Sequence, residues 1–223
     1  MKRWLALAGA MLAGPVGAET REDEQLWINL TAMGSVKGDL IYFAEVQPRF
    51  GDGVSRLDML LLRPAIGWRI SPRVSIYQGF ARVISPVDGG RDRAESRPFQ
   101  QLTWTLPPSR RGEVQLRSRL EERWRNDGDG VGVRMRQMVR GEYALAASGQ
   151  GVRALAHAEL FVGFNETDWG ARKGFDQLRS FVGAEVPVGG KSTVEAGYLN
   201  QVIDQGAVTR VNHVASLSLF VRH

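Results

Sequence analysis

Hydrophobic and polar residues alternate one by one along most of the chain after residue 18. In the clearest stretch, Glu113 to Arg125, most even positions are apolar and the odd positions are polar or charged. The odd positions include Arg117, Arg119 and Arg123. A period of two places alternate residues on opposite faces of a β-strand, whereas a helix would spread these arginines around its axis. The pattern therefore predicts a strand with one apolar face and one charged face.

Ten further segments show the same alternation and are separated by clusters of Gly, Pro, Asp and Ser. Most of the segments are 9 to 15 residues long. Strands of globular proteins most often have about 5–6 residues, whereas a tilted strand that crosses a bilayer needs about 9–11. The segments are Leu26–Gly34, Asp39–Phe50, Ser55–Ile70, Arg73–Ser85, Glu95–Leu106, Val133–Tyr143, Arg153–Phe164, Phe175–Val186, Ser192–Ile203 and Arg210–Arg222.

These segments predict an all-β fold: a single antiparallel transmembrane β-barrel. Single-chain bacterial barrels usually have an even number of strands, so we expect about 12 strands, with 10 as the alternative. The weakest segment is Ser55–Ile70, because it contains Pro64. Short connections such as Ser71-Pro72 alternate with longer ones such as 86–94 and 165–174. This is the expected arrangement of periplasmic turns and outer loops.

A soluble β-sandwich or lipocalin-like barrel would also alternate, and it remains an alternative. The membrane barrel is favoured by strand length, by polar faces rich in Arg and Glu, and by aromatic residues near strand ends, where interfacial girdles lie. The last strand alternates as in such barrels but ends in His223 instead of the usual Phe. The aromatic residues are Phe50, Trp68, Trp104, Trp124, Phe164, Phe175 and Phe220.

The first 18 residues have the three parts of a secretory signal peptide. Lys2 and Arg3 precede a short apolar run, and small residues follow, ending at Ala18. The apolar run is shorter than the roughly 20 residues of a membrane-spanning helix. We therefore predict a cleaved signal at 1–18 and a barrel domain at 19–223, exported to the outer membrane of a Gram-negative bacterium. The chain has no cysteine, so this fold is expected to need no disulfide.

Several clusters of residues resemble one family, an uncharacterised group of predicted outer-membrane β-barrels known as domain of unknown function 2490. The resemblance covers nearly all of the chain after the signal, and it implies the fold and the location but no established activity. It departs from the expected pattern at Ala65, where we expect glycine after Arg-Pro. The matching clusters are the stretches 56–73, 75–80, 95–104 and 117–124 and the pair Asn212-His213.

The charged faces predict an arginine-rich lumen. Two interpretations follow: a narrow pore or pathway for anionic solutes, or a non-conducting structural or loop-presenting barrel whose interior is filled by ion pairs. The pore is the first expectation, because arginines exceed carboxylates on these faces. The candidate lumen-lining residues are Glu45, Arg49, Arg63, Arg97, Arg117, Arg119, Glu121, Arg123, Arg134, Arg136, Arg140, Glu142, Glu159, Arg179 and His213.

Other chemistry has little support in the sequence. A lipid hydrolase would need a serine beside a histidine, but Ser216 and Ser218 fall on the strand face opposite His213. We expect no enzyme, no catalytic residue, no cofactor and no metal, since cysteines and paired histidines are lacking. The net charge of +5 is spread along the chain, which argues against nucleic acid. The expected partners are outer-membrane lipid and lipopolysaccharide, the barrel-assembly machinery during insertion, and small anionic solutes.

Overall fold

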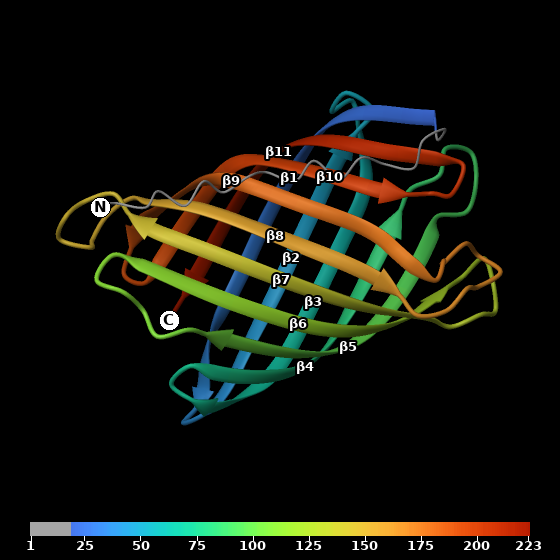
Figure 1. The fold of residues 1–223 in the computed structure, drawn as a ribbon. Helices are drawn as coiled ribbons and strands as arrows, with labels where there is room; N and C mark the ends of the chain where they lie inside the picture. Colours follow the sequence, from blue (N-terminus) through green and yellow to red (C-terminus); the bar gives the residue numbers. More distant parts are fainter. Residues whose placement is uncertain (1–18) are drawn as a thin grey trace, which may run out of the picture.

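The computed structural model describes residues 19–223, which form a closed barrel of tilted strands without helices (Figure 1). This confirms the all-β barrel. The predicted signal peptide, 1–18, lies outside the described residues. None of residues 19–223 belongs to a helix that is long and apolar enough to cross a membrane. The strands are β1 (Glu19–Lys37), β2 (Leu40–Gly51), β3 (Arg56–Ser71), β4 (Val74–Ser85), β5 (Arg93–Thr105), β6 (Gly112–Arg125), β7 (Gly132–Ala144), β8 (Arg153–Gly163), β9 (Gly174–Gly189), β10 (Ser192–Asp204) and β11 (Val208–Arg222).

The barrel closes through a parallel pair of strands. Each strand is antiparallel to the next along the chain, but β1 and β11 run in the same direction, in register from Glu19 opposite Val208 to Met33 opposite Arg222. A meander reverses direction at every turn, so an odd number of strands makes the first and last parallel. The described residues form eleven strands, between the expected 12 and 10. The segment around Pro64 forms one continuous strand, β3. The difference between the expected and the observed number of strands therefore does not arise from this segment.

Two of the prolines in the strands, Pro64 and Pro98, lie where the pairing with one neighbouring strand is interrupted. The β3–β4 register passes from Leu62 to Ala65, and the β5–β6 register from Ser96 to Phe99, so Pro64 and Pro98 fall in the gaps. Proline has no backbone N–H to donate to a neighbouring strand. Each gap covers two consecutive positions of the proline-containing strand, and the pairing resumes in the same register on the other side.

The outward face is apolar and carries aromatic side chains toward both ends of the barrel. One end, called the outer end here, carries the loops 52–55, 86–92, 126–131, 164–173 and 205–207, with Phe50, Trp124, Phe164 and Phe175 nearby. The opposite, inner end carries the short turns 38–39, 72–73 and 190–191 and the longer connections 106–111 and 145–152, with Tyr42, Trp68, Trp104 and Tyr143 nearby. Phe220 was expected among the aromatic residues of the interfacial girdles, but it does not face outward. It is in register with the buried Thr31 on the inward face, and Arg222 stacks on its ring.

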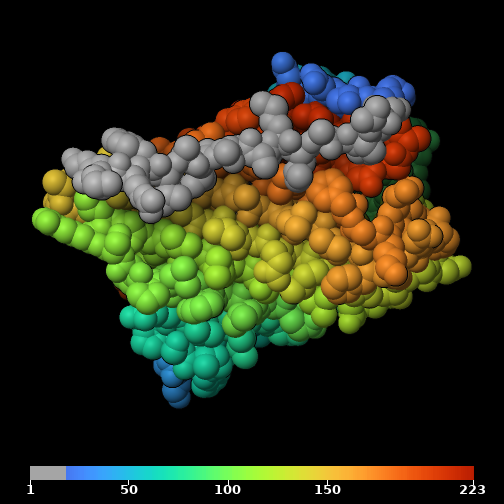
Figure 2. All heavy atoms as spheres, viewed as in Figure 1, coloured from blue at the N-terminus to red at the C-terminus, as the bar shows by residue number. Residues whose placement is uncertain are grey.

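Large side chains fill much of the interior. One apolar cluster contains Trp27, Leu155, Phe181, Leu199 and Val214, and another contains Phe43, Ala65 and Phe99. The Phe99 ring lies over Gly79, where a Cβ atom would come within 2.1 Å of the ring. Glycine at that position lets the aromatic ring pack against the backbone of the neighbouring strand. In the space-filling view the wall formed by β6–β9 is continuous (Figure 2).

The parallel closure can be tested with an engineered disulfide, because the chain has no cysteine of its own. Ala32 and Val221 are register partners on β1 and β11. Adjacent strands are about 4.8 Å apart, which suits disulfide geometry. We expect Ala32→Cys with Val221→Cys to form a disulfide, seen as a mobility shift of the denatured protein on a non-reducing gel.

The matched control is Leu26→Cys with Val221→Cys. This pair lies six positions out of register, or roughly 20 Å along the strand, and is expected to stay reduced. Oxidation of the control pair without oxidation of the test pair would mean that the two strands pair in another register or direction.

Candidate functional site

The charged interior begins with two neighbouring strands, β6 and β7. Their register places Arg119 opposite Arg136 and Glu121 opposite Arg134. Two like charges directly opposite each other are unfavourable, so the Arg119–Arg136 pair needs carboxylates from elsewhere. Period-two alternation turns all of these side chains inward. Glu121 on β6 and Glu159 on the neighbouring strand β8 supply the carboxylates.

Two glutamates each bind two arginines at the centre. Glu121 accepts hydrogen bonds from Arg136 Nη1 at 2.7 Å and from Arg134 Nη2 at 2.6 Å. Glu159, on β8, accepts from Arg136 Nε at 2.9 Å and from Arg117 Nη2 at 2.7 Å. Arg136 therefore joins the two glutamates. These groups, together with Arg119, are called the central network.

The central network is almost inaccessible to solvent, except for Arg117, whose side chain is 21% exposed. The exposed fraction is 1% for Glu121, 2% for Arg119 and 4% for Arg136. Removing one member of a buried ion pair leaves an uncompensated charge and typically costs about 3–5 kcal/mol. The network consequently depends on all of its members being present together.

Further ion pairs extend the network toward the outer end. Glu95 accepts two hydrogen bonds from Arg97, both at 2.8 Å, and also binds Arg123. Asp176, on β9, binds Arg134 at 2.7 Å. Arg134 thus connects this outer layer to Glu121.

At the inner end, one arginine binds three carboxylates. Arg140 donates to Glu142 at 2.8 Å, to Glu195 at 2.7 Å and to Glu185 at 3.5 Å. Arg140 lies on β7 and Glu195 on β10, which are not neighbours in the barrel. The contact therefore crosses the interior and restricts the space between these strands.

Aromatic rings separate the guanidinium groups. Arg134, Arg136 and Arg179 lie over the Phe161 ring at 5.0, 4.5 and 4.7 Å from its centroid. Arg119 lies over Phe99 at 4.3 Å. Guanidinium groups stack well on aromatic faces. The rings add contact for arginines whose charges would otherwise repel, and they occupy volume that an open pore would leave to water.

The structure places the candidate lumen residues on the inward face, with one exception. His213 lies between the buried Asn212 and Val214 and so faces outward. There its Nδ1 atom is 2.7 Å from the Tyr198 hydroxyl. The inward residues are Glu45, Arg49, Arg63, Arg97, Arg117, Arg119, Glu121, Arg123, Arg134, Arg136, Arg140, Glu142, Glu159 and Arg179.

Four carboxylates of the ion pairs described above were absent from the candidate set: Glu95, Asp176, Glu185 and Glu195. Alternation could have found two of them, because Glu95 lies two positions before Arg97 and Glu185 lies six positions after Arg179. Asp176 is harder, since a bulge between Phe161 and Val162 shifts the β8–β9 register near its strand end. With these four residues the interior has more negative charge to compensate its arginines than the sequence indicated.

A latch between two loops covers part of the outer end. The Asp168 carboxylate, in the loop after β8, accepts hydrogen bonds from the backbone N–H groups of Asp129 and Gly130, each at 2.9 Å. These bonds hold the pKa of Asp168 below its ordinary value. The neighbouring Trp169 is buried, with Arg123 and Arg125 each 5.1 Å from its ring centroid. The latch thus holds an indole over the outer layer of arginines.

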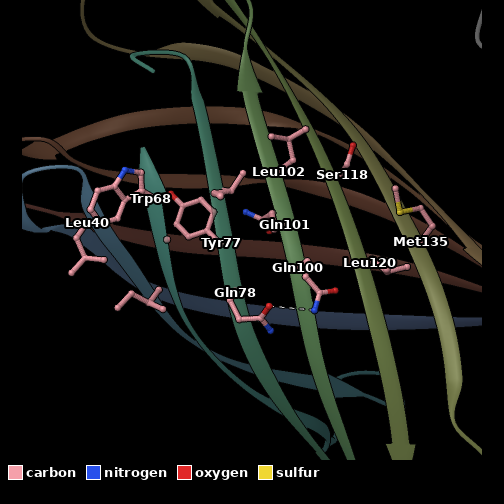
Figure 3. Close-up of a pocket in the computed structure, with 13 residues that line it drawn as sticks. Leu40, Trp68, Tyr77, Gln78, Gln100, Gln101, Leu102, Ser118, Leu120 and Met135 are labelled. Atoms are coloured by element: carbon pink, nitrogen blue, oxygen red, sulfur yellow. Dashed lines mark hydrogen bonds between the residues drawn. The ribbon is translucent and has the colours of Figure 1, made fainter. Parts of the chain in front are cut away.

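The outward wall has a hollow of about 650 Å³ beside β4, β5 and β6 (Figure 3). It is mostly apolar but includes Gln78, Gln100 and Ser118. Gln100 Nε2 donates to Gln78 Oε1 at 3.2 Å, and Ser118 donates to Gln137 at 2.8 Å. Partner groups within the wall thereby satisfy part of the hydrogen-bonding capacity of these outward polar groups.

His157 faces inward and lies flat against Phe181, with the ring centroids 4.9 Å apart. Its Nδ1 atom is buried and has no hydrogen-bond partner within the described part of the chain. Residues 19–223 also contain no group of three or more acidic or histidine side chains placed to hold a metal ion.

Glu121→Gln should destabilise the barrel, because Arg134 and Arg136 each lose a buried carboxylate. We expect a loss of about 3–5 kcal/mol in the free energy of unfolding, measured by urea titration in lipid vesicles with tryptophan fluorescence. The neighbouring Glu122→Gln makes the same chemical change on the outward face and should stay within about 0.5 kcal/mol of wild type. Equal effects of the two variants would show that Glu121 does not hold the network.

Asp168→Ala should release the loop 164–173 and expose Arg172 and Lys173 to trypsin. We expect faster cleavage there than in wild type or in the matched loop variant Glu166→Ala, measured by mass spectrometry of limited digests. The folded pKa of Asp168 is depressed, so the contribution of the latch is present above the unfolded value of about 3.9. It is lost as the pH falls through the folded value. Equal cleavage of the three proteins would argue against the latch.

Known proteins include a relative and solved structures that are similar to this chain. The chain is 48% identical to an uncharacterised protein of Methylorubrum extorquens over 209 residues, which cover 92% of this chain and 90% of that protein. Among solved structures, it resembles the NanC porin, with a TM-score of 0.50 and 10% identity over 82% of this chain and 87% of the porin. It also matches the outer-membrane protein OmpT of Vibrio cholerae, with a TM-score of 0.42 and 13% identity over 80% and 61% of the two chains.

At such low identity, the likeness to NanC shows the fold alone: a barrel similar to those of outer-membrane porins. A family model described as protein of unknown function, DUF2490, matches residues 24–212. The match spans most of the barrel, from β1 into β11, and agrees with the resemblance noted in the sequence. The chain belongs to the DUF2490 family.

Proposed function

We propose that the protein spans the outer membrane of a Gram-negative bacterium, surrounded by lipid and lipopolysaccharide after insertion by the barrel-assembly machinery. The support is the outward apolar surface between two sets of aromatic residues, which matches the hydrophobic band and girdles of such barrels. Exposed members include Ile66, Val139 and Val182, more than half of whose surface is accessible. In water, this many exposed apolar side chains would be unfavourable.

Within that membrane, the barrel acts as a closed structural scaffold that presents its outer loops, and it does not serve as a permanently open pore. The observation that carries this proposal is the burial of the central network. Glu121 and Glu159 are 1% and 3% exposed, and each is bound to two arginines from neighbouring or next-nearest strands. A solute moving along the axis would have to break these ion pairs or displace Phe161 and Phe99.

Among the outer loops, the two loops joined by the latch form the best candidate surface for binding a partner. Asp168 and Asn165 bind the backbone of the loop 126–131 and of Val133, so the two loops form one ordered unit. An ordered loop pair lowers the entropic cost of binding compared with a mobile one. On this proposal the protein is not an enzyme.

Passage of anionic solutes is the second candidate, and a specific observation favours it. Arg49 and Arg179 point inward without a carboxylate within 4.0 Å among residues 19–223. A surplus of positive charge would attract anions into the barrel. For them to cross, the central network would have to rearrange, so this function requires a second, open conformation.

Planar-bilayer recording distinguishes the two candidates. The closed barrel predicts no stepwise conductance from wild-type protein whose folding is confirmed by its heat-dependent gel mobility. Glu121→Ala with Arg136→Ala removes one buried pair without changing the net charge and should introduce measurable conductance.

The control for this experiment is Gln78→Ala with Gln100→Ala, a pair on the outward wall that should remain silent. Frequent wild-type channels with anion preference would instead establish the pathway. Location is tested separately by separating inner and outer membranes on a density gradient; recovery of the protein in the soluble fraction would overturn the membrane proposal.

A further inference from the structure

Two inward-facing arginines, the buried Arg49 and the half-buried Arg179, lack ion pairs of the kind that hold the central network. Arg49, on β2, is 7% exposed and donates to Gln47 Oε1 at 3.0 Å and 2.6 Å. Arg179, on β9, donates to Gln177 Oε1 at 3.2 Å. Within the described part of the chain, no carboxylate lies within 4.0 Å of either guanidinium group. A neutral amide does not compensate a buried positive charge.

Both guanidinium groups lie against one indole ring. The Cζ atom of Arg49 is 3.6 Å and that of Arg179 is 5.1 Å from the Trp27 ring centroid. The two strands that carry them are separated in the barrel by β1, β11 and β10. Trp27 lies on β1 between them, so the two positive groups contact the same indole ring inside the barrel.

The surroundings add positive charge. Arg179, Arg63 and Arg97 act on Arg49 together with the carboxylate of Glu45. Glu159 is the register partner of Arg179 on β8, but it is already bound to Arg136 and Arg117. Glu45 is already bound to Arg63 at 3.1 Å. In addition, Arg63 Nε is a buried donor that has no hydrogen-bond partner among residues 19–223. The region therefore has surplus positive charge and an unused N–H donor.

We propose that this region binds a small oxyanion, a carboxylate or phosphate group, between Arg49 and Arg179 beside Trp27. Guanidinium forks bind two oxygens of such a group through charge-assisted hydrogen bonds, which are about twice as strong as neutral ones. A bound oxyanion would supply the missing countercharge. Chloride, which cannot bridge the forks in this way, should bind more weakly. The site goes beyond the scaffold role, because a closed barrel can hold a bound anion without passing it.

The test uses folded protein in detergent micelles, titrated with inorganic phosphate or acetate against sodium chloride at equal ionic strength. We expect the oxyanions to raise the midpoint of thermal unfolding more than chloride does, since a ligand that binds only the folded state stabilises it. The same titration should change the tryptophan fluorescence. Trp27→Phe should abolish most of that fluorescence change and retain the stabilisation.

Arg49→Gln with Arg179→Gln should lower the affinity for the oxyanion by about tenfold or more. Because the two charges are unpaired, this variant should be at least as stable as wild type in chloride alone. The matched control, Arg82→Gln with Arg93→Gln, removes the same charge from the outward wall and the outer rim and should titrate like wild type.

Two outcomes would overturn the proposal: an equal shift in the Arg49/Arg179 variant and wild type, or no difference between oxyanions and chloride. The result is independent of the bilayer recordings, because neither a silent nor a conducting barrel determines whether the anion binds at Arg49 and Arg179. Replacement of both residues by lysine keeps the charge but removes the forks. It should retain weak binding, which separates general attraction from a specific site.

Discussion

Two buried glutamates, Glu121 and Glu159, each bind two arginines, and the interior of the barrel is organised around them. The guanidinium groups cannot be buried alone, because an uncompensated charge in a low-dielectric interior is far less stable than one in water. Sharing each carboxylate between two arginines allows fewer acidic residues to stabilise many basic ones. It also makes the ion pairs depend on one another, since Glu121, Glu159 and Arg136 each bind more than one partner.

The other structural features are consistent with this constraint. Phe161 and Phe99 lie against the arginines and occupy the remaining volume, and Gly79 leaves room for the Phe99 ring. Arg140 reaches from β7 to Glu195 on β10, and Trp169 covers the outer layer under the loop latch. A barrel filled in this way has an interior packed like the core of a globular protein, and on the membrane proposal its outward surface faces lipid instead of water. Arg49 and Arg179 have no carboxylate within 4.0 Å among residues 19–223 to compensate their charge. For this reason we propose that they bind an oxyanion.

Much of the architecture could be predicted from the sequence, because a strand period of two is a local property. The alternation located the eleven segments and placed Arg117, Arg119 and Arg123 on one face. The strand number was expected to be even by analogy with other barrels, and nothing local in the sequence indicates that β1 and β11 pair in parallel. His213 was misplaced because a polar residue was assumed to face the lumen, although its position between Asn212 and Val214 turns it outward.

Whether the interior is filled could not be read from the sequence. That depends on which carboxylate meets which arginine across non-adjacent strands, as Arg140 meets Glu195, and on register shifts such as the bulge at Phe161. The contact of Asp168 with the loop 126–131 could not be predicted from the sequence either. Its partners are backbone N–H groups, whose positions depend on the folded loop.

The central claim is that shared ion pairs hold the interior closed, and a double-mutant cycle on Arg136 and Glu159 tests it most directly. The measurement is the free energy of unfolding in lipid vesicles for wild type, Arg136→Gln, Glu159→Gln and the double variant. The account predicts that the double variant loses less than the sum of the single losses, with a coupling of at least about 1 kcal/mol. Losses that add within about 0.5 kcal/mol would contradict it.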